Sequence, residues 1–187
     1  MNNKLRFYPR YPRLVCVESA YAGDVVANRA FLREALQDSL LRGEAPVASH
    51  AYLPDVLDDS DTEQRSIGLQ AGHAWAKQAA LIVIYLREGE PISRGVVERL
   101  ATVAPAQDMT PIEVRVKRAN ADNPGGLEFA RFTVIGRHVD LDGALLACIP
   151  SEHTRRVGDV DLWAASSMSG RQREWREAHI IAAINRG

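Results

Sequence analysis

The sequence has little of what marks secreted, membrane-embedded or nucleic-acid-binding proteins. Its two cysteines, Cys16 and Cys148, lie far apart, and Cys16 falls in an apolar run, which favours a buried hydrophobe over a nucleophile or a disulfide partner. The formal net charge of -1 creates no field that would recruit nucleic acid or an anionic membrane. No apolar run approaches the ~18 residues of a membrane helix, and the basic N-terminus lacks the apolar centre of a signal peptide. We therefore expect a cytoplasmic protein with neither a membrane nor a nucleic-acid partner.

Metal-binding patterns are missing as well. No group of His, Cys, Asp and Glu residues has a recognisable ligand spacing, so the sequence predicts no metal site and no cofactor. His138, Asp140 and Asp142 alternate with apolar residues, which is typical of a strand end rather than of a cation site. The sequence also contains no internal repeats and no low-complexity tracts.

What the sequence does contain is an alternation of short apolar runs with helical patterns. Residues 80–86 (ALIVIYL) are almost continuously apolar, which is typical of a strand covered on both faces in a parallel sheet. The order strand-helix-strand-helix-strand-helix-strand predicts an α/β fold, with helices on both faces of a parallel sheet and right-handed crossovers. The other strands are expected at 14–17, 46–49 and 112–116, the last alternating as an edge strand would, and the helices at about 24–42, 60–77 and 93–102.

Local signals place the starts of the first two helices. Asp24 is expected to cap the first helix, and residues 60–63 (SDTE) fit a capping box for the second. Four apolar residues of the second helix are spaced to form its inner face: Ile67, Ala71, Ala74 and Trp75.

A composition break at residues 120–126 (NADNPGG) indicates a domain boundary. We expect one domain at residues 1–118 and a small mixed α+β C-terminal extension of unknown role at residues 119–187. The expected elements of this extension are a strand at 129–135, an apolar segment at 143–149 and an amphipathic helix at 170–185.

The segment most informative about function is residues 15–24 (VCVESAYAGD). A short apolar strand stops at Glu18, turns through small residues and enters a helix behind Asp24. In open α/β sheets, ligands bind at the carboxyl ends of the strands, and helix N-termini attract anions. A nucleotide-like site is therefore the first functional hypothesis.

Five sequence blocks, taken in order, resemble a known superfamily. They are 18–24 (ESAYAGD, followed by Asn28), 43–50 (GEAPVASH), 57–59 (LDD), 68–75 (GLQAGHAW) and 92–96 (ISRGV). Over residues 14–117 the chain resembles the nucleoside 2-deoxyribosyltransferase superfamily, and in particular its often virus-encoded branch with an ESPY-GD type motif. The resemblance implies a Rossmann-like fold, a nucleoside or nucleotide as ligand, and assembly into homo-oligomers.

The resemblance also implies chemistry at the N-glycosidic bond. Catalytic members attack the anomeric carbon with a carboxylate on the helix after the third strand, as retaining glycosidases do, while a second acid protonates the departing base. Their glutamate stands four residues after the turn glycine, where this chain has Arg99, whereas Glu98 stands three residues after Gly95. Since one residue turns a helix by about 100°, Glu98 is either a nucleophile realigned by its loop or a solvated surface residue. Glu18 is the second carboxylate: it either binds ribose hydroxyls or acts as an acid/base, or it holds the following turn.

The other candidate ligand-binding residues follow the predicted strands. His50 would contact a base or phosphate or only pack at a strand end, and Asp58 and Asp59 would gate the pocket or only solvate a loop. Ser93 and Gly95 would help to bind an anion or only begin the helix. The full set expected at the pocket is Ser19, Tyr21, Gly23, Asp24, Asn28, His50, Asp58, Asp59, Ser93, Arg94 and Gly95.

Two functions remain open at this point. The first is cleavage of, or deoxyribosyl transfer at, the N-glycosidic bond of a nucleoside or nucleotide by Glu98 and Glu18. The second is non-catalytic binding that sequesters or senses a nucleotide. The displaced glutamate favours binding, and the direction of the Glu98 side chain relative to the pocket distinguishes the two.

Overall fold

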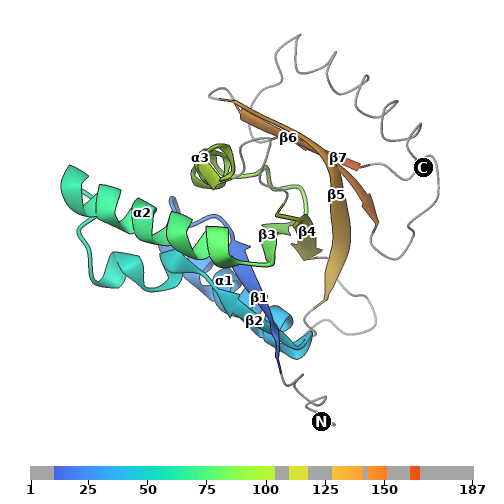
Figure 1. The fold of residues 1–187 in the computed structure, drawn as a ribbon, viewed down its shortest axis with the longest axis horizontal. Coiled ribbons are helices and arrows are strands. Elements are labelled where there is room, and N and C mark those ends of the chain that lie inside the picture. Colours follow the sequence, from blue (N-terminus) through green and yellow to red (C-terminus); the bar gives the residue numbers. More distant parts are fainter. Residues whose placement is uncertain (1–10, 104–109, 118–127, 141–142, 151–160, 165–187) are drawn as a thin grey trace.

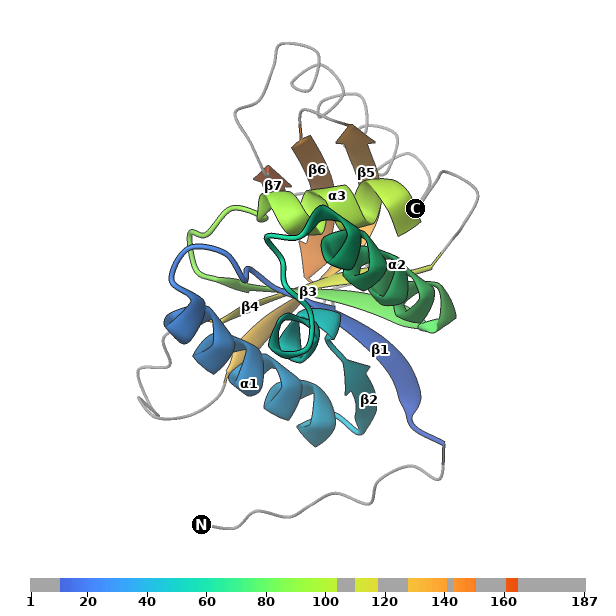
Figure 2. The same cartoon turned by 90° about the vertical axis from the view of Figure 1, so that its left-hand side faces the viewer.

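The computed structural model of the protein describes residues 11–103, 110–117, 128–140, 143–150 and 161–164. These residues form an α/β structure, as predicted, on a seven-stranded mixed sheet of order β2-β1-β3-β4-β5-β6-β7 (Figures 1 and 2). The elements in chain order are β1 (Arg13–Glu18), α1 (Val25–Leu41), β2 (Glu44–Val47), the 3₁₀ helices η1 (Ser49–Ala51) and η2 (Leu53–Asp55), α2 (Thr62–Gln78), β3 (Leu81–Arg87), α3 (Arg94–Val103), β4 (Ile112–Lys117), β5 (Phe129–Asp140), β6 (Gly143–Pro150) and β7 (Asp161–Ala164). Among the described residues, no helix has the length and apolar character needed to cross a membrane.

The strands β2, β1, β3 and β4 are parallel, and helices cover both faces of this half of the sheet. On one face, Phe31 of α1 belongs to a core cluster with Val83. On the other face, Ala76 of α2 and Leu100 of α3 belong to a second cluster with Ile82. Figure 2 shows α1 on one side of the sheet and α2 and α3 on the other. Because alternate residues of β3 enter the two cores, this strand is apolar at nearly every position.

The strands β5, β6 and β7 extend the same sheet in antiparallel order, so the sheet continues past residue 118. The prediction that residues 112–116 form an edge strand was wrong, because β4 lies between β3 and β5. Its polar residues Glu113 and Arg115 are 6% and 0% exposed, so the alternation there reflects buried ion pairs rather than a solvent-facing side. The helix predicted at 170–185 lies outside the described residues.

Arg115 is the centre of a buried ionic network on the α1 face of the sheet. Its guanidinium donates hydrogen bonds to both carboxylate oxygens of Glu44 (2.8 and 2.7 Å), to Glu113 (2.6 Å) and to the Tyr85 hydroxyl (2.6 Å). The Tyr85 hydroxyl donates in turn to Asp38 (2.9 Å). Burial opposes ionisation of Glu44, but the hydrogen bonds and charge of Arg115 outweigh it and lower the pKa of Glu44 to about 2. The network therefore ties β4 to β2 and to the end of α1.

The orientation of α2 differs from the prediction. Its buried residues are Gly72 and Ala76, whereas Ile67 and Trp75, which were expected on the inner face, are 52% and 49% exposed. Small residues face the rest of the molecule because α2 packs against the buried side chain of Arg99, which leaves no room for a larger side chain at position 72. The apolar periodicity of α2 thus marks its outer face.

The helix starts were predicted nearly correctly. Asp24 caps α1 as expected, since its side chain accepts a hydrogen bond from the backbone N–H of Ala27 (3.0 Å). The N-cap of α2 is Asp61 rather than Ser60, and its carboxylate accepts two backbone N–H groups of the first turn. His50 lies in η1, beyond the end of β2, and not at the strand end itself.

Candidate functional site

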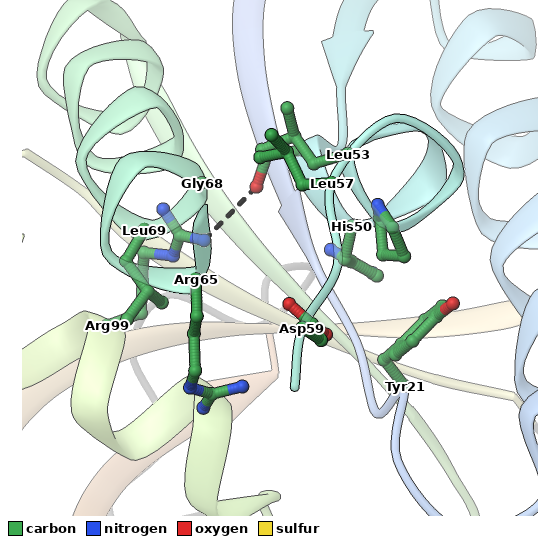
Figure 3. A pocket seen from close by; sticks show the side chains of 11 residues that line it. Tyr21, His50, Leu53, Leu57, Asp59, Arg65, Gly68, Leu69 and Arg99 are labelled. Atoms are coloured by element: carbon green, nitrogen blue, oxygen red, sulfur yellow. Dashed lines mark hydrogen bonds between the residues drawn. The ribbon is translucent and has the colours of Figure 1, made fainter. Parts of the chain in front are cut away.

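A pocket of about 110 Å³ lies beside the carboxyl ends of β1 and β2 (Figure 3). Its lining comes from four places: the turn after β1, the η1–η2 segment with the loop behind it, α2 and α3. The lining residues are Tyr21, Ser49, His50, Leu53, Pro54, Leu57, Asp59, Arg65, Gly68, Leu69 and Arg99. Three of the residues predicted from the sequence, Tyr21, His50 and Asp59, therefore meet in one place.

Arg99 is the buried cation of the pocket. Its Nε lies 3.0 Å from Oε1 of Glu18, and its Nη2 donates a hydrogen bond to Oγ of Ser49 (3.1 Å), drawn as the dashed line in Figure 3. Its Nη1 is buried without a hydrogen-bond partner in the part of the chain that the structure describes. Burial raises the pKa of Glu18, and Arg99 partly offsets this effect. Arg99 thus brings a partly satisfied guanidinium to the pocket, and Glu18 balances its charge.

Glu18 is enclosed behind Arg99 and is not among the residues that line the pocket. The residue is 4% exposed, and its Oε1 also accepts a hydrogen bond from the Cys16 thiol (3.5 Å). Burial raises the pKa of Cys16, and the neighbouring Glu18 raises it further. Cys16 is therefore a protonated, buried hydrophobe, consistent with the interpretation of its sequence context.

His50 is held neutral at the pocket. Burial lowers its pKa to about 4, and the charge of Arg99 acts in the same direction. Its Nε2 lies 3.0 Å from Oγ of Ser19, and the ring of Tyr21 approaches it edge-on with centroids 6.3 Å apart. Neutral imidazole offers one donor and one acceptor, so His50 provides hydrogen-bonding capacity without charge.

The wall that contains Leu53, Pro54 and Leu57 is held in place from two sides. Arg29 of α1 makes two hydrogen bonds of 2.7 Å to the carboxylate of Asp55. The Asp58 carboxylate accepts hydrogen bonds from the backbone N–H (2.9 Å) and the hydroxyl (2.7 Å) of Ser60, and these bonds lower the pKa of Asp58. Asp58 therefore stabilises the turn before α2, and only Asp59 of the acidic pair lines the pocket.

Several other predicted residues support the turn after β1. The Asn28 side-chain amide donates to the backbone carbonyls of Tyr21 (3.2 Å) and Ala22 (2.9 Å), and its carbonyl accepts from Arg87 (3.1 Å). Gly23 has a positive φ of 89°, which favours glycine. Asn28, Gly23 and the capping residue of α1 thus fix the loop that carries Tyr21.

The residues predicted around the start of α3 lie outside the pocket lining. Arg94 pairs with Glu98 at 3.0 Å, and their side chains are 92% and 48% exposed. Ser93 accepts a backbone hydrogen bond at the start of α3, while Gly95 has open space where a Cβ would lie. The carboxylate of Glu98 therefore forms a surface ion pair, while the next residue, Arg99, is buried.

The sequence interpretation missed most of the pocket. It did not select Arg99 or Arg65, nor the lining residues Ser49, Leu53, Pro54, Leu57, Gly68 and Leu69. One signal was available for Arg99, which stands where the resemblance expects a carboxylate. Among the described residues, no cluster of three or more His, Cys, Asp or Glu could hold a metal ion.

The fold and the site define an α/β protein with a small pocket at the carboxyl ends of its first two strands, where a buried arginine–glutamate pair lies. The chain belongs to the family described as Domain of unknown function (DUF7768), whose match spans residues 13–113, just over half of the 187 residues. Comparisons with curated proteins and with solved structures gave no match. The matched range includes every residue that lines the pocket and ends within β4.

Proposed function

We propose that the protein binds a nucleoside or nucleotide without cleaving it. The observation that carries this proposal is the buried Arg99, which stands at the helix position of the nucleophile in the superfamily that the sequence resembles. We also propose that the domain is Rossmann-like, which the order β2-β1-β3-β4 and the helices on both faces support. The five sequence blocks support a relationship to the nucleoside 2-deoxyribosyltransferase superfamily.

The lining of the pocket suits one ring of such a ligand. Its volume of about 110 Å³ is well below the ~300–1,000 Å³ of sites that enclose a whole drug-sized ligand. A nucleobase would lie against Leu53, Pro54 and Leu57, with the neutral His50 offering hydrogen bonds to its edge. The sugar and any phosphate would then extend outwards.

Two exposed charged residues lie among the lining residues. Asp59 would accept hydrogen bonds from sugar hydroxyls, and Arg65 would form charge-assisted hydrogen bonds with a phosphate. Both side chains are visible in Figure 3, where Asp59 lies between Arg65 and Tyr21 in this view. The ligand class that this arrangement favours is a nucleoside monophosphate.

The placement of the carboxylates argues against glycosidic cleavage. Glu18 is 4% exposed and paired with Arg99, so its carboxylate has no open path to a bound sugar. Glu98 is engaged with Arg94 outside the pocket lining. With its pKa lowered to about 4, His50 is neutral rather than an imidazolium at neutral pH, which makes it a poor general acid for a leaving base, and the charge of Arg99 adds to this effect.

The test is calorimetric titration with nucleosides and their 5′-monophosphates, followed by chromatography of each mixture for free base. We expect at least one monophosphate to bind and to be recovered intact. Arg65→Gln should weaken the monophosphate about tenfold or more, since a charge-assisted hydrogen bond contributes ~1.5–3 kcal/mol, while the nucleoside changes little. Arg94→Gln removes the same charge outside the pocket lining and should change neither affinity.

Two outcomes would contradict the proposal. One is that no member of the panel binds. The other is release of free base that disappears in the Glu18→Gln variant, which would make the protein a glycosidase or transferase instead.

A further inference from the structure

Asp59 and Arg65 are charged residues of the pocket lining that the fold does not use. Neighbouring charged residues are engaged within the chain, since Arg99 pairs with Glu18 and Asp61 caps α2. The side chains of Asp59 and Arg65 are exposed and make no hydrogen bond or ion pair with any other residue that the structure describes. A few such polar groups in an otherwise apolar pocket fix the orientation of a ligand and decide which ligand is accepted.

The turn that carries Asp59 is held in place by hydrogen bonds of its neighbours. The backbone N–H of Asp58 donates to the side-chain carbonyl of Gln64 (3.0 Å), and the carbonyl of Asp58 accepts from the backbone N–H of Asp61 (3.1 Å). The Asp58 carboxylate accepts two further hydrogen bonds from Ser60. The backbone of Asp59 is therefore fixed while its carboxylate stays free, and a partner that is already positioned lowers the entropic cost of binding a ligand.

The chemical groups of the pocket follow the order of the parts of a nucleotide. Leu53 and Leu57 belong to the apolar wall of the pocket. In the view of Figure 3, the Asp59 carboxylate lies between this wall and the guanidinium of Arg65. A nucleotide carries its base, its sugar and its phosphate in that same sequence. With the base at the apolar wall and the phosphate at Arg65, the sugar lies beside Asp59.

We propose, on the basis of the proposed function, that Asp59 makes the site selective for ribonucleotides over 2′-deoxyribonucleotides. An ionised carboxylate has two oxygens that only accept hydrogen bonds, and the 2′- and 3′-hydroxyls of ribose supply two donors on one face of the sugar. An acidic side chain binds the ribose hydroxyl in the same way in dinucleotide-binding folds. A 2′-deoxyribose supplies one donor fewer. The preference is the reverse of the deoxyribosyl chemistry that the resemblance implies.

Calorimetric titration of the full chain with three sugar forms of one nucleoside 5′-monophosphate tests this selectivity. The ribose form should bind about tenfold more tightly than the 2′-deoxyribose form, the difference expected from one charge-assisted hydrogen bond. The arabinose form keeps both hydroxyls but places the 2′-hydroxyl on the opposite face of the sugar. It should therefore bind as weakly as the 2′-deoxyribose form. A 2′-deoxyribose or arabinose form that binds as tightly as the ribose form would overturn the inference.

Asp59→Ala tests whether this carboxylate is responsible. The ratio of the ribose to the 2′-deoxyribose affinity should fall from about ten to about one. An altered attraction for the phosphate changes both affinities alike and leaves this ratio as it was. Glu63→Ala removes the same charge from an exposed position outside the pocket lining and should preserve the ratio.

Two results separate the failure of this inference from that of the proposed function. A ratio that stays at about ten in Asp59→Ala contradicts the role of Asp59 while nucleotide binding itself stands. If the wild-type chain binds none of the three sugar forms of any base, the proposed function fails, and the selectivity fails with it.

Discussion

Gly72 is the residue on which the geometry of the candidate site depends. A Cβ at this position would lie 2.4 Å from Nη1 and 2.7 Å from Nη2 of Arg99, and 2.8 Å from Oγ of Ser49. Only a glycine lets α2 approach the guanidinium that pairs with Glu18. Gly72 lies in one of the five sequence blocks that carry the resemblance. A glycine is needed there because the side chain of Arg99, which comes from α3, occupies the space that a Cβ would fill.

We expect Gly72→Ala to lower the free energy of unfolding by about 1–3 kcal/mol, the usual cost of overpacking, although alanine favours a helix by about 1 kcal/mol. Urea denaturation measures this change. Gly95→Ala is the matched control, because nothing lies within 4 Å of its added Cβ, and it should be neutral or slightly stabilising. Equal stability of the two variants would show that the close approach at Gly72 does not exist.

At the scale of elements, β4 and α2 are the two whose surroundings the sequence did not reveal. The alternation in β4 predicted an edge strand, but β5 pairs with its free side and Glu113 and Arg115 are buried. The apolar stripe of α2 predicted an inward face, but Ile67 and Trp75 are exposed. A periodic pattern identifies two sides of an element, but it does not show which side meets the core, because buried ion pairs or small residues can also form the inner side.

The role of β4 can be tested at its buried cation. Arg115→Met removes the charge but keeps much of the volume, and it leaves Glu44 and Glu113 without their shared partner. We expect a loss of about 3–5 kcal/mol in unfolding free energy, as for other broken buried ion pairs. Arg94→Met removes an arginine that is 92% exposed and should cost under ~0.5 kcal/mol. Chemical denaturation measures the free energy of unfolding of both variants. Similar losses in the two would mean that the Arg115 network contributes little to stability.

At the scale of the whole molecule, two buried groups set the stability in separate ranges of pH. His50 has a folded pKa of about 4, below the ~6.5 of an unfolded histidine. Between these values the unfolded chain binds a proton that the folded chain does not, so stability falls as the pH drops from about 6.5 to 4. Glu44 has a folded pKa of about 2 against a usual value of 4.5, and its contribution is lost as the pH falls through that lower range.

We expect the free energy of unfolding to decrease by about 3 kcal/mol between pH 6.5 and pH 4 because of His50 alone. Denaturant titrations at a series of pH values measure the profile. His50→Gln should remove most of the pH dependence between pH 6.5 and pH 4. It should leave in place the decline below pH 4.5, where the unfolded chain binds a proton at Glu44 that the folded chain does not. If the free energy of unfolding of the variant still decreases by the full amount between pH 6.5 and pH 4, His50 is not the group responsible.

The sequence by itself determined the parallel strands, the capped start of α1 and the position of the turn after β1 that carries Tyr21 to the pocket. These features depend on local periodicity and on hydrogen bonds between near neighbours, which a short segment contains in full. Only the tertiary structure decided that Arg99 rather than Glu98 enters the site, that β4 is an interior strand and that the apolar face of α2 points outwards. Whether a charge is buried depends on a partner far away in the chain, as Glu18 is for Arg99, and no local pattern carries that information.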